Sequence, residues 1–167
     1  NKSLSFMELI ELQIAYIKKS EEKILSLVNF DEELYLKKAK DFDSQIIEGY
    51  LAKVPIGVKD LIDIEGIETE ANSKSLSGNM PKNDADIVHK LKNEGAFVAM
   101  KTNTHEYAYG AVSPPTKNPW DFSKIPGGSS GGSAAATSAG IVLASLGSDT
   151  AGSIREPAAL CSVVGFK

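Results

Sequence analysis

The first 50 residues have the hydrophobic periodicity of helices. In the stretch "SFMELIELQIAYIKKS", apolar side chains recur every three or four positions, which is typical of a helix with one buried face. Ser5 and Glu8 have the spacing of a capping box at its start. A second run, "DEELYLKKAKDFDSQII", predicts a helix that begins after the cap residue Asp31 and ends before Gly49. We expect both helices to pack on a core or on a partner.

From Leu51 onward, short apolar runs alternate with helical segments. "VPIGVKD" predicts a strand that ends near Lys59, and "AFVAMK" and "IVLASLG" predict further buried strands. "NDADIVHKLKNEG" predicts a helix that is capped by Asp84 and ends at Gly95. "REPAALC" predicts a short helix with Pro157 in its first turn, and "VVGFK" reads as a last strand. This alternation predicts an α/β fold, with a helical segment at 1–50 and a core at 51–167.

Composition and charge narrow the class of protein. The chain is 42% hydrophobic and 24% charged, as in ordinary globular domains, and its net charge of −4 comes without a basic block. Direct nucleic-acid binding is therefore not expected. No apolar run is long enough for a membrane span, and no signal peptide opens the chain. The one cysteine, Cys161, fits a reducing compartment, so we expect a cytoplasmic protein. Because the chain begins at Asn1 and stops in an expected strand, we also expect a fragment.

Several familiar kinds of site do not match. The Gly-rich stretch "PGGSSGGSAAATSAG" lacks the lysine of a phosphate-binding loop and the G-x-G-x-x-G pattern, so glycines that allow close backbone approach are the better interpretation. The two histidines, His89 and His105, have no feature that marks them as a base, and the G-x-S-x-G motif is missing. No metal site is predicted, because His and Cys residues are few and widely spaced.

A serine and a lysine remain as candidates for chemistry. In "GSDTAGSIREPAALC", Ser153 follows small residues and precedes Arg155. In "VPIGVKD", Lys59 stands at the end of an apolar strand, where burial would lower its pKa and let the amine accept a proton. The residues alone leave the alternatives open, since Ser153 can be a turn residue and Lys59 can reach solvent.

Taken together, these segments resemble the amidase signature family. The resemblance lies in "PIGVKD", "PGGSSGGSAAA" and "GSDTAGSIREPAALCSVVGFK", with "KTNTHEYAYG" and "TKNPWD" between them, and it covers roughly 51–167. It implies a mixed β-sheet between helices and hydrolysis of an amide through an acyl-enzyme, with no cofactor and no metal. Matched by motif, it implies Lys59 as the catalytic lysine and Ser129 as a bridging serine after a cis peptide bond. Ser153, 24 positions later, is then the nucleophile.

The same resemblance implies roles for the loop around Ser153. Its oxyanion hole would consist of the backbone N–H groups of Thr150, Ala151, Gly152 and Ser153. Asp149 and Arg155 flank this loop, and we expect them to hold its shape rather than to transfer protons. Small side chains suit such a loop, because they let consecutive amides converge on one oxygen.

Three features depart from the family pattern. Ala151 stands where a second glycine is usual, which is harmless only if its φ angle is not positive. Glu156 replaces an apolar or amide residue; we expect it to pair with Arg155, and the alternative is selection of a cationic substrate group. The connection "AYGAVSPPTKNPWD" is shorter than usual, which predicts an unusual substrate preference.

Three functions follow from the resemblance. The leading one is an amidase that converts a small-molecule amide into an acid plus ammonia or an amine; a homodimer is compatible with this function, and no membrane is involved. The alternative within the family is the glutamine-hydrolysing subunit of a tRNA-dependent amidotransferase, which would need partner subunits. The alternative from another class is a non-catalytic binding or assembly relative, motivated by the three departures.

Overall fold

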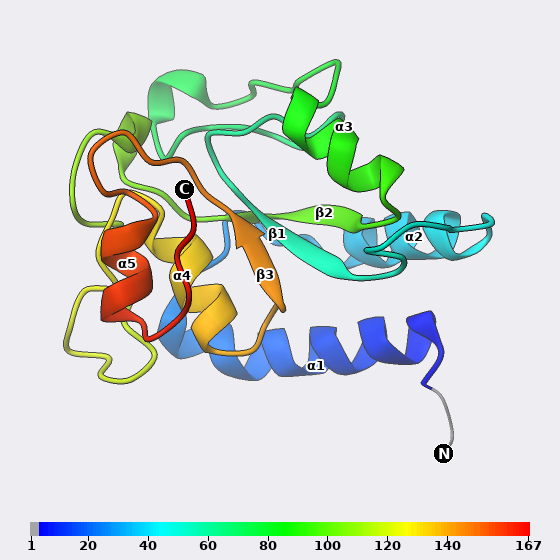
Figure 1. Ribbon diagram of the computed structural model, residues 1–167, viewed down its shortest axis with the longest axis horizontal. Helices are drawn as coiled ribbons and strands as arrows, with labels where there is room; N and C mark the ends of the chain where they lie inside the picture. The colour runs from blue at the N-terminus through cyan, green and yellow to red at the C-terminus, as the bar shows by residue number, and fades with distance from the viewer. Residues whose placement is uncertain (1–3) are drawn as a thin grey trace.

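The computed structural model of the chain describes residues 4–167 (Figure 1), so positions 1–3 of the predicted helical segment lie outside the described residues. The described elements are, in order, α1 (Phe6–Ile24), α2 (Glu32–Asp43), β1 (Pro55–Lys59), η1 (Lys74–Leu76), α3 (Asp86–Asn93), β2 (Phe97–Thr102), η2 (Glu106–Ala108), α4 (Gly131–Ser138), β3 (Ala144–Leu146) and α5 (Arg155–Leu160). The predicted α/β class with two leading helices is therefore confirmed.

The three strands form one parallel sheet in the order β2-β1-β3. Lys59 at the end of β1 lies opposite Thr102 of β2, and Val58 lies opposite Leu146 of β3. Because parallel strands end at the same edge of a sheet, the residues that follow all three strands meet there. This edge is where the predicted lysine and the segment after β3 come together.

Helices cover both faces of the sheet (Figure 1). On one face, apolar side chains of α1, α2, α4 and β2 form a cluster around Ile10, Tyr35 and Phe97. On the other face, α3 packs against β1 and β2 through a second cluster around Val58 and Val88. The N-terminal helices thus share a hydrophobic core with the sheet. Among residues 4–167, none of the helices combines the length and the apolar character that crossing a bilayer requires.

The predicted start of the first helix is confirmed in detail. Ser5 Oγ accepts a hydrogen bond from the Glu8 N–H (3.2 Å), and the Glu8 carboxylate accepts one from the Ser5 N–H (2.9 Å). Asp31 caps α2 by accepting a hydrogen bond from the Leu34 N–H (3.0 Å). Both caps satisfy backbone donors that a helix cannot satisfy by itself.

The predicted cap of α3 is wrong. Ala85 occupies the cap position, and its side chain makes no capping hydrogen bond. The Asp84 carboxylate instead binds Lys92 Nζ (2.6 Å) and accepts a hydrogen bond from the Glu65 N–H (2.8 Å). A lysine two turns along the helix and a loop amide therefore take the carboxylate away from the helix start. Gly95, with a φ angle of 83°, ends the helix as predicted.

Two predictions about apolar runs are also wrong. β3 is short and half-exposed rather than buried, because in the described sheet only β1 lies beside it. The segment "VVGFK" forms no strand within residues 4–167, and Val164 is 97% exposed. An apolar run shows that a segment favours a strand, but a strand also needs a neighbouring strand to accept its hydrogen bonds.

Candidate active site

Lys59 lies at the end of β1 and is completely buried. Hydrogen bonds join its Nζ to Ser129 Oγ (2.6 Å) and to Ser148 Oγ (2.9 Å). Burial lowers the pKa of the Lys59 amine to about 8, although the negative charge of Asp149 opposes this change. A substantial fraction of this amine is therefore neutral near physiological pH and able to accept a proton.

Ser129 is buried at the turn before α4, and the peptide bond between Gly128 and Ser129 is cis. The Ser129 carbonyl accepts hydrogen bonds from the His105 N–H (3.1 Å) and from Ser113 Oγ (3.0 Å). A side chain at Gly128 would come within 2.6 Å of the Val112 nitrogen, so this position requires glycine. The Gly/Ser stretch is thus a tightly packed turn that directs the Ser129 hydroxyl to Lys59.

The loop after β3 passes beside Ser129. The Ser130 N–H donates to the Ser153 carbonyl (3.1 Å), which holds the two serine-bearing segments together. Within residues 4–167, the Ser153 hydroxyl makes no hydrogen bond, and the amides of 150–153 have no acceptor. Consecutive amides with free N–H groups can bind an oxygen that gains negative charge.

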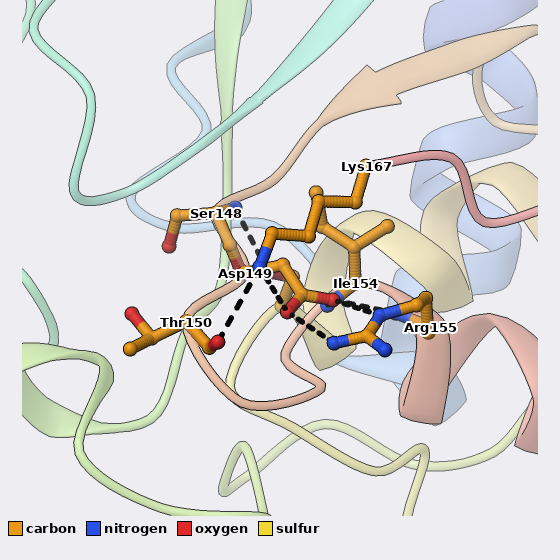
Figure 2. A network of polar contacts seen from close by, with 7 residues as sticks. Ser148, Asp149, Thr150, Ile154, Arg155 and Lys167 are labelled. Carbon is orange, nitrogen blue, oxygen red and sulfur yellow. Dashed lines mark hydrogen bonds and ion pairs between the residues drawn. The ribbon is translucent and has the colours of Figure 1, made fainter.

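Asp149 organises this loop, as Figure 2 shows. Its carboxylate accepts hydrogen bonds from the Ile154 N–H (3.1 Å), the Arg155 N–H (3.3 Å) and two guanidinium nitrogens of Arg155 (3.0 and 2.9 Å). The hydrogen bonds from Arg155 hold the pKa of the Asp149 carboxyl well below its usual range. Lys167 Nζ lies 3.8 Å from the same carboxylate. The predicted pairing of Glu156 with Arg155 is wrong, because the bidentate partner of Arg155 is Asp149.

The question about Ala151 is resolved by its backbone. Its φ angle is not positive, so its methyl group causes no backbone strain in the loop. The structure also places the two histidines. His89 is exposed on α3, and His105 Nδ1 is hydrogen-bonded to the Val112 carbonyl (2.6 Å). In the described part of the chain, neither imidazole hydrogen-bonds to Ser153.

Sequence reasoning missed Ser148 and a buried ion pair between Asp60 and Lys101. Lys101 had a usable signal, because it ends the apolar run "AFVAMK" as Lys59 ends "VPIGVK". Asp60 directly follows Lys59, but its neighbour in the fold is far away in the sequence. Ser148 had no signal that distinguishes it from the other serines of this Gly/Ser-rich chain.

Comparisons with known proteins find related sequences and related folds. The sequence matches the amidase family over residues 8–167. A glutamyl-tRNA(Gln) amidotransferase subunit of Carboxydothermus hydrogenoformans is 44% identical over 175 residues, covering 99% of this chain and 36% of that protein.

Two solved structures show the same fold. One comes from a vestigial protein complex linked to the evolutionary origins of an s-triazine catabolic enzyme; it has a TM-score of 0.85, is 39% identical, and is matched over 94% of this chain and 36% of that one. The other, 6-aminohexanoate cyclic dimer hydrolase, has a TM-score of 0.84, is 30% identical, and is matched over 94% of this chain and 33% of that one. The chain thus spans about a third of the length of these relatives.

Proposed function

This chain belongs to the amidase family, and from that membership we propose that the protein carrying it hydrolyses a carboxylic amide through an acyl-enzyme on Ser153. The observation that carries the proposal is the short hydrogen bond between the buried Lys59 amine and Ser129. Burial makes the amine a base near neutral pH, and the residue next to Ser129, Ser130, is hydrogen-bonded to the Ser153 carbonyl.

In the first half of the reaction, the Ser153 hydroxyl turns toward Ser129 as the amide binds. Neutral Lys59 takes the proton of Ser129 Oγ, which takes the proton of Ser153 Oγ, and the Ser153 oxygen forms a bond to the amide carbon. The carbonyl oxygen becomes an oxyanion that the free N–H groups of 150–153 stabilise. The C–N bond then breaks, and the leaving nitrogen receives a proton from Ser129, which Lys59 replenishes.

In the second half, water attacks the ester carbon of the acyl-enzyme. Its proton passes through Ser129 to Lys59, and collapse of the second tetrahedral intermediate returns a proton to Ser153 and releases the carboxylic acid. We assign Asp149 and Arg155 to holding the loop in place, because their bidentate pair also fixes the amides at 154 and 155.

A second candidate is the glutamine-hydrolysing subunit of a tRNA-dependent amidotransferase. It is favoured by the 44% identity to a glutamyl-tRNA(Gln) amidotransferase subunit in Carboxydothermus hydrogenoformans. On this reading, glutamine is the amide, and partner subunits take up the ammonia. Glutamine hydrolysis that depends on added partner subunits would support it, whereas turnover by the isolated protein would favour a free-standing amidase, for which a homodimer stays a prediction.

In both cases we propose a cytoplasmic location, since the only thiol, Cys161, is buried and unpaired among the described residues.

Covalent labelling tests the proposed reaction. We expect an aryl fluorophosphonate to add once, on Ser153, with a rate that rises with pH around a midpoint of about 8, because the neutral amine of Lys59 is the base. Lys59→Met and Ser129→Ala are expected to slow labelling by at least about 100-fold, since each interrupts the proton path. Intact mass and peptide mapping over a pH series measure both effects.

Ser153→Ala is the control for the position of the adduct. No adduct on a protein that circular dichroism shows to be folded would contradict the proposal and favour the non-catalytic binding or assembly relative. An adduct on another serine would move the nucleophile away from Ser153.

A further inference from the structure

We propose that the buried ion pair between Asp60 and Lys101 positions Lys59 and Ser129 for proton transfer, a role that rests on the function proposed above. Within residues 4–167, neither side chain has a hydrogen bond or ion pair with Lys59, Ser129 or Ser153, so both are positioning residues. Their contacts reach the two ends of the Lys59–Ser129 hydrogen bond by separate routes.

The pair itself is buried and connected to several segments. Lys101 Nζ lies 3.1 Å from Asp60 Oδ1, and the side chains are 2% and 0% exposed. The same Nζ donates to the Ile62 carbonyl (2.8 Å) and to Thr69 Oγ1 (2.7 Å). Within residues 4–167, Asp60 Oδ1 receives no hydrogen bond, so the charge of Lys101 is its compensation.

The first route leads to Lys59. Asp60 follows Lys59 directly, and its N–H donates to the Thr102 carbonyl (2.8 Å), which continues the pairing of β1 with β2. The Lys59 carbonyl accepts a hydrogen bond from the Ile62 N–H (3.0 Å), while the Ile62 carbonyl is bound by Lys101. Lys101 therefore holds the turn that follows β1 through the Ile62 carbonyl. This contact fixes the backbone from which the Lys59 side chain extends.

The second route leads to Ser129. Asp60 Oδ2 accepts a hydrogen bond from the Glu70 N–H (3.2 Å). Two residues later, Asn72 Nδ2 donates to the Thr104 carbonyl (2.9 Å). The N–H of His105, the residue after Thr104, donates to the carbonyl of Ser129 (3.1 Å). Three hydrogen bonds, linked by short stretches of backbone, thus join the ion pair to the segment that holds the bridging hydroxyl.

An ion pair suits this role because it tolerates little displacement. Burial raises the pKa of Asp60 and lowers the pKa of Lys101, and the attraction between them opposes both changes; Asp63 also raises the pKa of Lys101. Apolar side chains of similar volume would pack in several ways, whereas two buried charges must stay in contact. The pair therefore holds one arrangement of the turn.

Replacing both Asp60 and Lys101 separates an effect on the position of Lys59 and Ser129 from an effect on the stability of the fold. Asp60→Asn and Lys101→Met each leave one partner of the pair without its charge, so both are expected to destabilise the protein. The double variant Asp60→Leu/Lys101→Met removes both charges and is expected to remain folded. We expect it to be labelled at Ser153 about 10- to 100-fold more slowly, with the midpoint of the pH profile shifted above that of the wild type. The shift is expected because a displaced Lys59 amine regains contact with water.

The measurements use the protein at its full length: fluorophosphonate labelling over a pH series, with thermal unfolding followed by circular dichroism. Asp84→Asn is the matched control, because it breaks the partly exposed pair with Lys92 and is expected to leave the labelling rate unchanged. A folded double variant with the wild-type rate and midpoint would overturn this inference alone. Absence of labelling in the wild type would overturn the proposed function as well.

Discussion

The amine of Lys59 has two hydroxyl neighbours, and they need not act in the same way. A neutral amine has one lone pair, so it accepts a single proton along one direction. If an N–H of Lys59 donates to Ser148 Oγ (2.9 Å), the lone pair is free to point at Ser129 Oγ (2.6 Å). At the residue scale, we therefore expect Ser148 to orient the proposed base.

We expect Ser148→Ala to slow the labelling of Ser153 by about tenfold, or about 1.4 kcal/mol of barrier, because the amine can then rotate away from Ser129. Ser148→Thr keeps an oxygen at the same position and is expected to restore most of the rate. Labelling kinetics at a pH above the midpoint measure the effect. Equal rates for the alanine variant and the wild type would show that Ser129 alone orients Lys59.

At the scale of elements, the loop from 149 to 155 depends on one carboxylate. Asp149 binds two backbone amides and the guanidinium of Arg155. We expect Asp149→Asn to slow labelling by about 100-fold, because the amide side chain loses the charge-assisted bonds that hold the proposed oxyanion-binding loop in place. The expected readout is slower labelling without loss of the circular dichroism signal.

The matched control is Glu156→Gln, a neighbouring carboxylate with no ion pair in the described range 4–167. It is expected to leave the rate unchanged. A similar loss in both variants would mean that general negative charge near Ser153 matters, rather than the contacts of Asp149.

The sequence predicted the elements whose signals are local. The helical stripe and the caps at Ser5 and Asp31 depend on residues three or four positions apart, so they can be read directly. The cap at Asp84 was wrong because a residue eight positions away, Lys92, competes for the carboxylate. The burial of β3 was wrong because an apolar run does not reveal which strands lie beside it.

The residues of the candidate site also fall into those that the sequence indicates and those that it does not. The family resemblance supplied Lys59, Ser129 and Ser153, and their catalytic roles stay predictions until labelling is measured. Ser148 and the pairing of Lys101 with Asp60 could not be found, since Ser148 lies 89 positions after Lys59 and Lys101 lies 41 positions after Asp60, and these partners meet only when the sheet forms. The sequence marks Lys101 only as the end of an apolar run. Contacts of this kind are set by the fold and leave no local pattern.

At the scale of the whole molecule, the burial of Lys59 makes stability depend on pH. Its pKa falls from 10.5 to about 8 on folding, so between these values the unfolded chain holds a proton that the folded protein has released. The free energy of unfolding is therefore expected to rise with pH across this window, by up to about 3 kcal/mol, and this contribution is absent below pH 8.

Denaturant unfolding of the wild type and of Lys59→Met at several pH values between 7 and 11 measures this contribution. Other groups that titrate in the same range cancel in the difference between the two proteins. The rise is expected in the wild type alone; parallel curves would mean that Lys59 keeps its ordinary pKa in the folded protein.

The parallel order of the strands also has a consequence for synthesis on the ribosome. The two hydroxyl partners of Lys59 follow it by 70 and 89 positions. At roughly 5 to 20 residues per second, the lysine leaves the ribosome several seconds before either partner. For the early part of that interval β1 has neither neighbouring strand, because β2 (Phe97–Thr102) and β3 (Ala144–Leu146) both come later in the chain. The nascent chain therefore exposes its central strand for seconds, and we expect a chaperone that binds unpaired strands to act in this period.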